Sequence, residues 1–226
     1  MLRLLLALAL AGCTSQAASV IPPVSSMATQ SVTQDVPRLN GIYYALGDGI
    51  TNNPIDGTPN SYPAVLGKRL GITVQNLGVT GQPVGQVLVE AVPKIGADCS
   101  LLTLLAGGAD LIDKRIAAAQ VEPVFIEVFR AAKVRCPGGM IVLATYIDNA
   151  TQPVVHDNVE TYNQFLRSFA IQNHVPLVDL DHDKRFNDPP FPSPLMYNWA
   201  HPNDAGMIDV AQDFQTVIQA TENKHA

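Results

Sequence analysis

The chain has 226 residues, of which 47% are hydrophobic and only 15% are charged, so it is long enough to bury the core of one well-filled domain but short for two. Its formal net charge is −6, and no run of lysine and arginine is longer than a pair. Because nucleic-acid binding depends on clustered positive charge that releases counterions, nucleic acid is not an expected partner.

The first thirteen residues, MLRLLLALALAGC, place one positive charge before a short apolar stretch that ends in small residues and a cysteine. The stretch is far shorter than the roughly 20 residues that a membrane-spanning helix needs, so it is typical of an export signal. Residues 10–13 resemble the bacterial lipobox, in which the cysteine is acylated and becomes the mature N-terminus. We therefore expect residues 1–12 to be a signal peptide and Cys13 to carry a lipid anchor. The alternative is a plain secretory signal that is cleaved elsewhere.

The segment that follows Cys13 has the composition of a linker. Residues 14–37 contain one charged residue, three prolines and many Ser, Thr and Gln residues, and they show no helical or strand periodicity. Such a segment cannot bury enough apolar area to offset the entropy of ordering. We predict a lipidated flexible tether over residues 13–38 and a folded domain over residues 39–226. The expected location is outside the cytoplasm, lipid-anchored to a bacterial membrane on its periplasmic or outer-membrane face.

From Leu39 onward, short apolar runs alternate with longer amphipathic ones, as in parallel strands joined by crossover helices. The expected strands are 41–46, 72–77, 101–106, 140–146 and 175–180. The expected helices are 62–70, 84–92, 121–134, 155–173 and 204–220. Several strands are apolar on both faces, as strands covered by helices on two sides must be. We predict a three-layer α/β/α fold with a five-stranded parallel sheet of flavodoxin-like order 2-1-3-4-5, and a ligand site at the carboxyl ends of its strands.

Two cysteines belong to the predicted domain. Cys99 and Cys136 each precede a strand, the third and the fourth, and these strands are neighbours in the predicted order. Residues that enter adjacent parallel strands can lie close enough to form a disulfide. With Cys13 lipidated they are also an even pair in an oxidising compartment. We expect a structural disulfide at the end of the sheet opposite the ligand site. Two buried free thiols are the alternative.

Four short blocks follow strands or precede the last helix. They are GDGIT at 47–51, NLGVTG at 76–81, GGAD at 107–110 and NWAHPN at 198–203. In order and spacing these blocks resemble those of the SGNH (GDSL-type) hydrolases, over roughly residues 40–220. The resemblance implies an ester hydrolase fold. In that family the first block carries the serine nucleophile, the second and third carry an oxyanion-hole glycine and asparagine, and the last carries an Asp-x-x-His pair.

Five positions of this chain correspond to the family's functional residues, and only two of them keep the family's residue type. They are, in order, Gly49, Gly81, Ala109, Asn198 and His201. Gly49 has no atom that could form a covalent intermediate. Ala109 removes a side-chain donor to the developing oxyanion, a loss of about 10²- to 10³-fold. Asn198 cannot stabilise an imidazolium by charge and can hold the wrong tautomer; the same change in a serine-protease triad costs about 10⁴-fold. The sequence therefore predicts a degenerate family member, a pseudoenzyme without its nucleophile.

Three functions stay open at this point. The first is a domain that binds a small acyl ester or an acetylated carbohydrate without cleaving it. The second is a slow ester hydrolase that uses His201 with water or with Thr51, one of the nearest hydroxyls in the sequence together with Thr80. The third is an envelope scaffold with no small ligand.

Other polar residues near the blocks are expected to be structural. Asp48 is placed with Gly81 on the oxyanion or ligand-binding side of the site, and Asp48 and Asp110 are both expected to bind turn or helix N-terminal amides. Trp199 either lines the ligand pocket or packs the last helix. The acidic run DLDHDK, at 179–184, is expected to form a solvated loop. No metal site and no cofactor are expected, because the five histidines show no paired ligand spacing.

Overall fold

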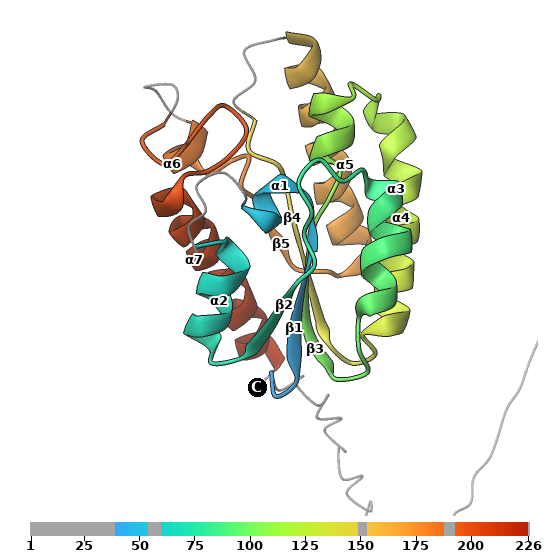
Figure 1. Ribbon diagram of the computed structural model, residues 1–226, viewed down its shortest axis with the longest axis vertical. Coiled ribbons are helices and arrows are strands. Elements are labelled where there is room, and N and C mark those ends of the chain that lie inside the picture. The colour runs from blue at the N-terminus through green and yellow to red at the C-terminus, as the bar shows by residue number, and fades with distance from the viewer. Residues whose placement is uncertain (1–38, 54–59, 149–152, 188–192, 226) are drawn as a thin grey trace, which may run out of the picture. The chain divides into compact units, whose positions relative to one another are not determined.

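Figure 1 shows a central β-sheet with helices on both of its faces. The computed structural model describes residues 39–53, 60–148, 153–187 and 193–225. The strands are β1 (Ile42–Gly47), β2 (Thr73–Asn76), β3 (Cys99–Leu105), β4 (Met140–Ala144) and β5 (Leu177–Val178). All of the pairings between them are parallel, and the strand order is β2-β1-β3-β4-β5. The predicted strand order is confirmed.

The helices complete three layers. The longer ones are α2 (Tyr62–Leu70), α4 (Ala118–Arg135), α5 (Pro153–Asn173) and α7 (Asp204–His225). The shorter ones are α1 (Gly49–Asn52), α3 (Val84–Gln86), α6 (Lys184–Asn187), the π-helical turns η1 (Val87–Ala91) and η3 (Ala109–Asp113), and the 3₁₀ turn η2 (Val92–Lys94). Helices α2 and α7 cover one face of the sheet, and α3, α4 and α5 cover the other (Figure 1). The predicted α/β/α class is thus confirmed.

Two expected elements differ from those found. The strand expected over 175–180 is reduced to two residues, and it begins only after Pro176, which cannot donate a ladder hydrogen bond. The helix expected over 84–92 is instead the succession α3, η1 and η2. Pro93 lies in η2 and lacks the N–H that would continue an α-helix. Each of the other expected elements begins within a few residues of the position predicted for it.

The central strands are buried because helices cover both of their faces. Every residue of β4 is buried, as are all residues of β3 except one. On the face covered by α4 and α5, the ring of Phe125 meets those of Tyr162, Phe165 and Phe169 edge to face, with centroids about 6 Å apart. The Tyr162 hydroxyl also donates to the carbonyl of Ala106, 2.9 Å away, just past β3. This packing holds α5 against the carboxyl end of the sheet, where the site lies.

A disulfide joins Cys99, the first residue of β3, to Cys136, which caps the end of α4. The two Cα atoms are 5.1 Å apart. Gly139 allows this approach, because a Cβ at that position would lie only 2.3 Å from the Cys136 sulfur. The bridge is therefore at the amino end of β3, whereas the predicted site residues follow the carboxyl ends of the strands.

The N-terminal predictions concern residues outside the described part of the chain. These are the signal peptide at 1–12, the lipidated Cys13 and the tether to residue 38. Within the described residues, no helix combines the length and apolar character needed to cross a membrane.

Candidate active site

A cavity of about 220 Å³ lies where the strands end. It is bounded by the segments that follow β1, β2, β3 and β4 and by the segment before α7. All five positions of the predicted constellation line it: Gly49, Gly81, Ala109, Asn198 and His201. The structure therefore brings together residues that are up to 152 positions apart along the sequence.

Asp48 joins the ends of three strands beneath this cavity. It is the N-cap of α1, and its carboxylate accepts hydrogen bonds from the Tyr146 hydroxyl (2.6 Å) and from the amides of Ile50 and Ala109 (3.4 Å each). The residue is only 4% exposed. Burial raises the pKa of Asp48 to about 6, although these hydrogen bonds oppose the shift. Its contacts are those of a structural residue that fixes the turn presenting Gly49.

The imidazole of His201 lies directly against the position of the missing nucleophile. A Cβ built on Gly49 would be 2.7 Å from Nε2 of His201 and 3.8 Å from the methyl group of Thr80. A serine at position 49 would therefore point at the base, as acyl transfer requires. A separation of 2.7 Å is too short for a real carbon contact, so the imidazole already occupies part of the space that a serine side chain needs.

Asn198 holds this imidazole in the orientation of a base. Its Oδ1 accepts hydrogen bonds from the amides of Ala200 (2.9 Å) and His201 (2.8 Å) and lies 3.3 Å from Nδ1 of His201. Two amide donors require an oxygen at this point, so the contact is a hydrogen bond when Nδ1 carries the ring hydrogen, and that tautomer leaves Nε2 as an acceptor. The amide oxygen of Asn198, and not its NH₂ group, therefore faces the imidazole. What the substitution removes is the negative charge.

Burial also lowers the pKa of the His201 imidazole below its ordinary value, although the negative charge of Asp113 opposes the shift. The ring is therefore neutral at pH 7. A neutral imidazole with a free Nε2 can accept a proton or a hydrogen bond, but position 49 has no side chain that could supply either one.

The oxyanion side of the cavity keeps its glycine and lacks its side-chain donor. Gly81 has φ +69°, a left-handed conformation that favours glycine, and a Cβ there would meet no atom within 4 Å. Ala109 begins η3 and offers the cavity only a methyl group. Next to it, Asp110 accepts a 2.7 Å hydrogen bond from the amide of Val84 at the start of α3. Asp110 is thus bound to a helix N-terminal amide.

Thr51 cannot take the place of the nucleophile. Its side chain is fully buried, and its hydroxyl lies 3.4 Å from that of Tyr62. A Cβ on Gly47 would come within 2.2 Å of this hydroxyl, which therefore faces the core beside β1. The alternative that used Thr51 is wrong for this reason. Thr80 is the threonine that lines the cavity, and its hydroxyl accepts from Nδ2 of Asn52 at 3.1 Å.

Several residues that line the cavity were not predicted. Tyr146 follows β4, and Ile112 and Asp113 belong to η3. The position of Tyr146 at the end of a central parallel strand was a usable signal. Asp113 lies one helical turn after Ala109, so its side chain was also within reach of the same site. Trp199 lines the cavity and is 42% exposed, which settles the choice left open for it.

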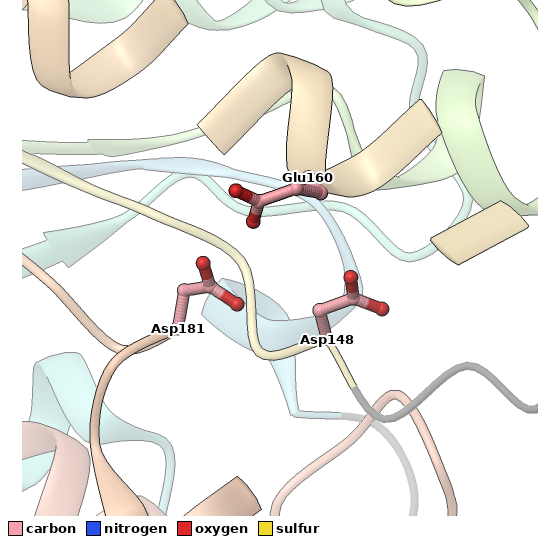
Figure 2. A group of neighbouring side chains, drawn as sticks. All are labelled: Asp148, Glu160 and Asp181. Atoms are coloured by element: carbon pink, nitrogen blue, oxygen red, sulfur yellow. The ribbon is translucent and has the colours of Figure 1, made fainter. Parts of the chain in front are cut away.

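A second group of polar side chains lies outside the cavity. Figure 2 shows Asp148, Glu160 and Asp181, each of which has a carboxylate oxygen within 4.8 Å of the other two. Carboxylate oxygens are the ligands that Ca²⁺ and Mg²⁺ prefer, so among the described residues this group could hold a metal. Nitrogen atoms already lie beside these acids, since His156 is 2.7 Å from Asp148 and Arg167 contacts Asp181. Arg167 also approaches Glu160 at 3.9 Å, so each of the three acids has a nitrogen partner within the protein.

The acidic run after β5 is not the solvated loop that the sequence predicts. Arg167 on α5 donates to both carboxylate oxygens of Asp179, at 3.0 Å each, and also to Asp181. Arg185 likewise binds Asp183. The carboxylate of Asp181 is largely buried by these contacts. Guanidinium groups from α5 and α6 explain the difference, because they draw the acids against the protein surface.

Comparison with known proteins agrees with this geometry. The model of the GDSL-like lipase/acylhydrolase family matches residues 45–207. Similar solved structures include a member of the lipolytic protein G-D-S-L family from Veillonella parvula DSM 2008, with TM-score 0.65 and 17% identity over 79% of this chain and 98% of that one. Phospholipase A1 from Streptomyces albidoflavus NA297 gives TM-score 0.61 and 15% identity over 78% and 99%. A mutant of an acetyl-xylooligosaccharide esterase from Geobacillus Stearmophilus gives TM-score 0.61 and 20% identity over 79% and 94%.

These identities are low enough that the solved structures support the fold alone. Comparison with curated proteins gives no match.

Proposed function

The chain belongs to the GDSL-like lipase/acylhydrolase family, and we propose that it is a degenerate member which binds a ligand in the family's active-site cavity without hydrolysing it. The observation that carries the proposal is the contact between the Gly49 position and Nε2 of His201. A base is present and oriented, but the position that it faces has no hydroxyl. Without a nucleophile no acyl-enzyme can form.

The other two substitutions act in the same direction. Ala109 leaves the oxyanion side without a side-chain donor, and Asn198 leaves a developing imidazolium without a compensating charge. Residues that act as a unit have non-additive effects, so the separate losses are not multiplied. The loss of the nucleophile is sufficient by itself to stop the family's covalent route.

The ligand suggested by the family resemblance is a small acyl ester or an acetylated carbohydrate. The cavity, at about 220 Å³, is smaller than the roughly 300–1,000 Å³ of sites for drug-sized ligands. A short acyl group or a single sugar unit suits this volume better than a long acyl chain.

Hydrolysis of p-nitrophenyl acetate by the purified protein tests this proposal, with the His201→Ala variant as the control. We expect no turnover by the wild type above that of the variant. Wild-type turnover that the histidine substitution abolishes would instead establish a hydrolase in which His201 activates water, and would overturn the proposal.

We further propose that the protein is exported and anchored to a bacterial membrane by a lipid on Cys13. The proposal rests on the signal-like residues 1–12 and on the resemblance of residues 10–13 to a lipobox. Expressed in a bacterium, the wild type should enter the detergent phase of a Triton X-114 partition, whereas Cys13→Ser should stay in the aqueous phase. Equal partition of the two proteins would exclude the lipid anchor.

A further inference from the structure

The base that the cavity retains has one ring nitrogen that can accept a hydrogen bond. Nδ1 of His201 faces the Asn198 oxygen, and Nε2 has no hydrogen-bond partner in the part of the chain that the structure describes. In a serine hydrolase the serine hydroxyl would donate to this nitrogen. Here the donor must come from water or from the ligand, and a ligand that supplies it replaces the hydrogen bond that the chain has lost.

An ester is poorly matched to this requirement. Its carbonyl and ether oxygens are acceptors and cannot donate to Nε2. The side-chain donor that would have met the carbonyl is also absent at Ala109. A free hydroxyl group, by contrast, can donate to Nε2 and still accept from a nearby donor. The substitutions at positions 49 and 109 therefore shift the preference of the cavity from the ester towards the alcohol.

The remaining lining indicates which alcohol fits. Asp113 presents a carboxylate, which disfavours anionic ligands such as free fatty acids and accepts hydrogen bonds from hydroxyl groups. Trp199 lines the same cavity and exposes 42% of its surface, so it offers an aromatic face to the apolar side of a sugar ring. The volume of about 220 Å³ accommodates a group of about this size.

We infer that the cavity takes a neutral polyhydroxylated ligand of the carbohydrate class, one free hydroxyl of which donates a hydrogen bond to Nε2 of His201. The inference rests on the proposed function and specifies the class of ligand that the cavity binds. Of the two ligands proposed above, it selects the carbohydrate, and it assigns the contact with the base to a free hydroxyl and not to an acetyl ester.

Glycerol and its triacetate, triacetin, form a matched pair of probes because only glycerol has hydroxyl donors. Each is titrated into the full protein labelled with ¹⁵N-histidine, at pH 7.5, while the Nε2 resonance of His201 is followed; the His201→Gln variant assigns that resonance. We expect a saturable shift with glycerol and with methyl β-D-glucopyranoside, and none with triacetin. An equal shift with triacetin, or no saturable shift with either hydroxylated probe, would overturn the inference.

The same samples separate this inference from the proposed function. Release of acetate from triacetin that is lost in the His201→Ala variant would overturn the non-hydrolytic proposal, whatever the shift of the Nε2 resonance. No acetate release combined with a triacetin-induced shift would leave the proposed function standing and would reject the free-hydroxyl contact.

The role of Trp199 has its own matched control. Tyr197 lies two residues away and is 55% exposed, but its side chain does not line the cavity. We expect Trp199→Ala to weaken the binding of methyl β-D-glucopyranoside several-fold and Tyr197→Ala to leave it unchanged. Equal affinities of the two variants would contradict the assignment of the ligand to the carbohydrate class.

Discussion

At the scale of single residues, one absent side chain decides the chemistry of this site. His201 is oriented by Asn198 and faces position 49, so the base of the family's mechanism persists without its nucleophile. A serine Cβ at position 49 would crowd Nε2, but that atom is at the far end of a side chain that can turn. The cavity is therefore close to one that could carry out acyl transfer.

Combining Gly49→Ser with Ala109→Asn and Asn198→Asp should restore hydrolysis of p-nitrophenyl acetate. A variant that keeps Asn198 should be slower by up to about 10⁴-fold, and one that keeps Ala109 slower by about 10²- to 10³-fold. The control is the same triple variant with Gly49→Ala in place of Gly49→Ser, since it adds the Cβ without the hydroxyl. A folded triple variant no more active than this control would show that the cavity has changed beyond the loss of its catalytic groups.

At the scale of elements, the site depends on bonds that tie short turns to one another. Asp110 in η3 accepts a 2.7 Å hydrogen bond from the amide of Val84, which begins α3. Asp48 likewise ties α1 to Tyr146 beyond β4. Turns of three to five residues have little stability of their own, so these side-chain bonds maintain the shape of the cavity.

Replacement of Asp110 by alanine should lower the free energy of unfolding by about 1–3 kcal/mol, because the buried Val84 amide loses its acceptor. Asp110→Asn keeps an acceptor oxygen and should cost less. Urea unfolding of the wild type and both variants at pH 7 measures the difference. Equal stability of the alanine variant and the wild type would contradict the structural role of this bond.

At the scale of the whole folded domain, the disulfide and the cavity lie at opposite ends of the sheet. The disulfide links residues 37 positions apart at the amino end of β3. The cavity lies beyond the carboxyl ends of the strands. Loss of the disulfide should therefore lower stability without changing the shape of the cavity.

Closure of a loop of this length corresponds to about 4 kcal/mol of stabilisation in the chain-entropy model. In urea unfolding, we expect the double variant Cys99→Ala, Cys136→Ala to lose a sizeable part of this stabilisation. The affinity for methyl β-D-glucopyranoside should stay the same below the unfolding transition. A reducing agent should destabilise only the wild type. Equal stability of the wild type and the double variant without a reducing agent would contradict the expected contribution of the disulfide.

The sequence by itself determined the class of fold, the strand order and the family. Apolar periodicity is a local property, and the alternation of strand and helix patterns restricts the topology to a few arrangements. The blocks around Gly49 and His201 could be aligned because each is a short run after a strand or before a helix. The sequence also determined which of the family's functional positions are substituted, because this comparison needs only the residue types.

Only the tertiary structure decided where the side chains point. The burial of Thr51 and the bond from Tyr146 to Asp48 depend on packing between segments far apart in the chain. The ion-paired Asp181 has the same origin, because Arg167 reaches it from α5. Local patterns carry no information about such contacts, which form only when the helices close over the sheet.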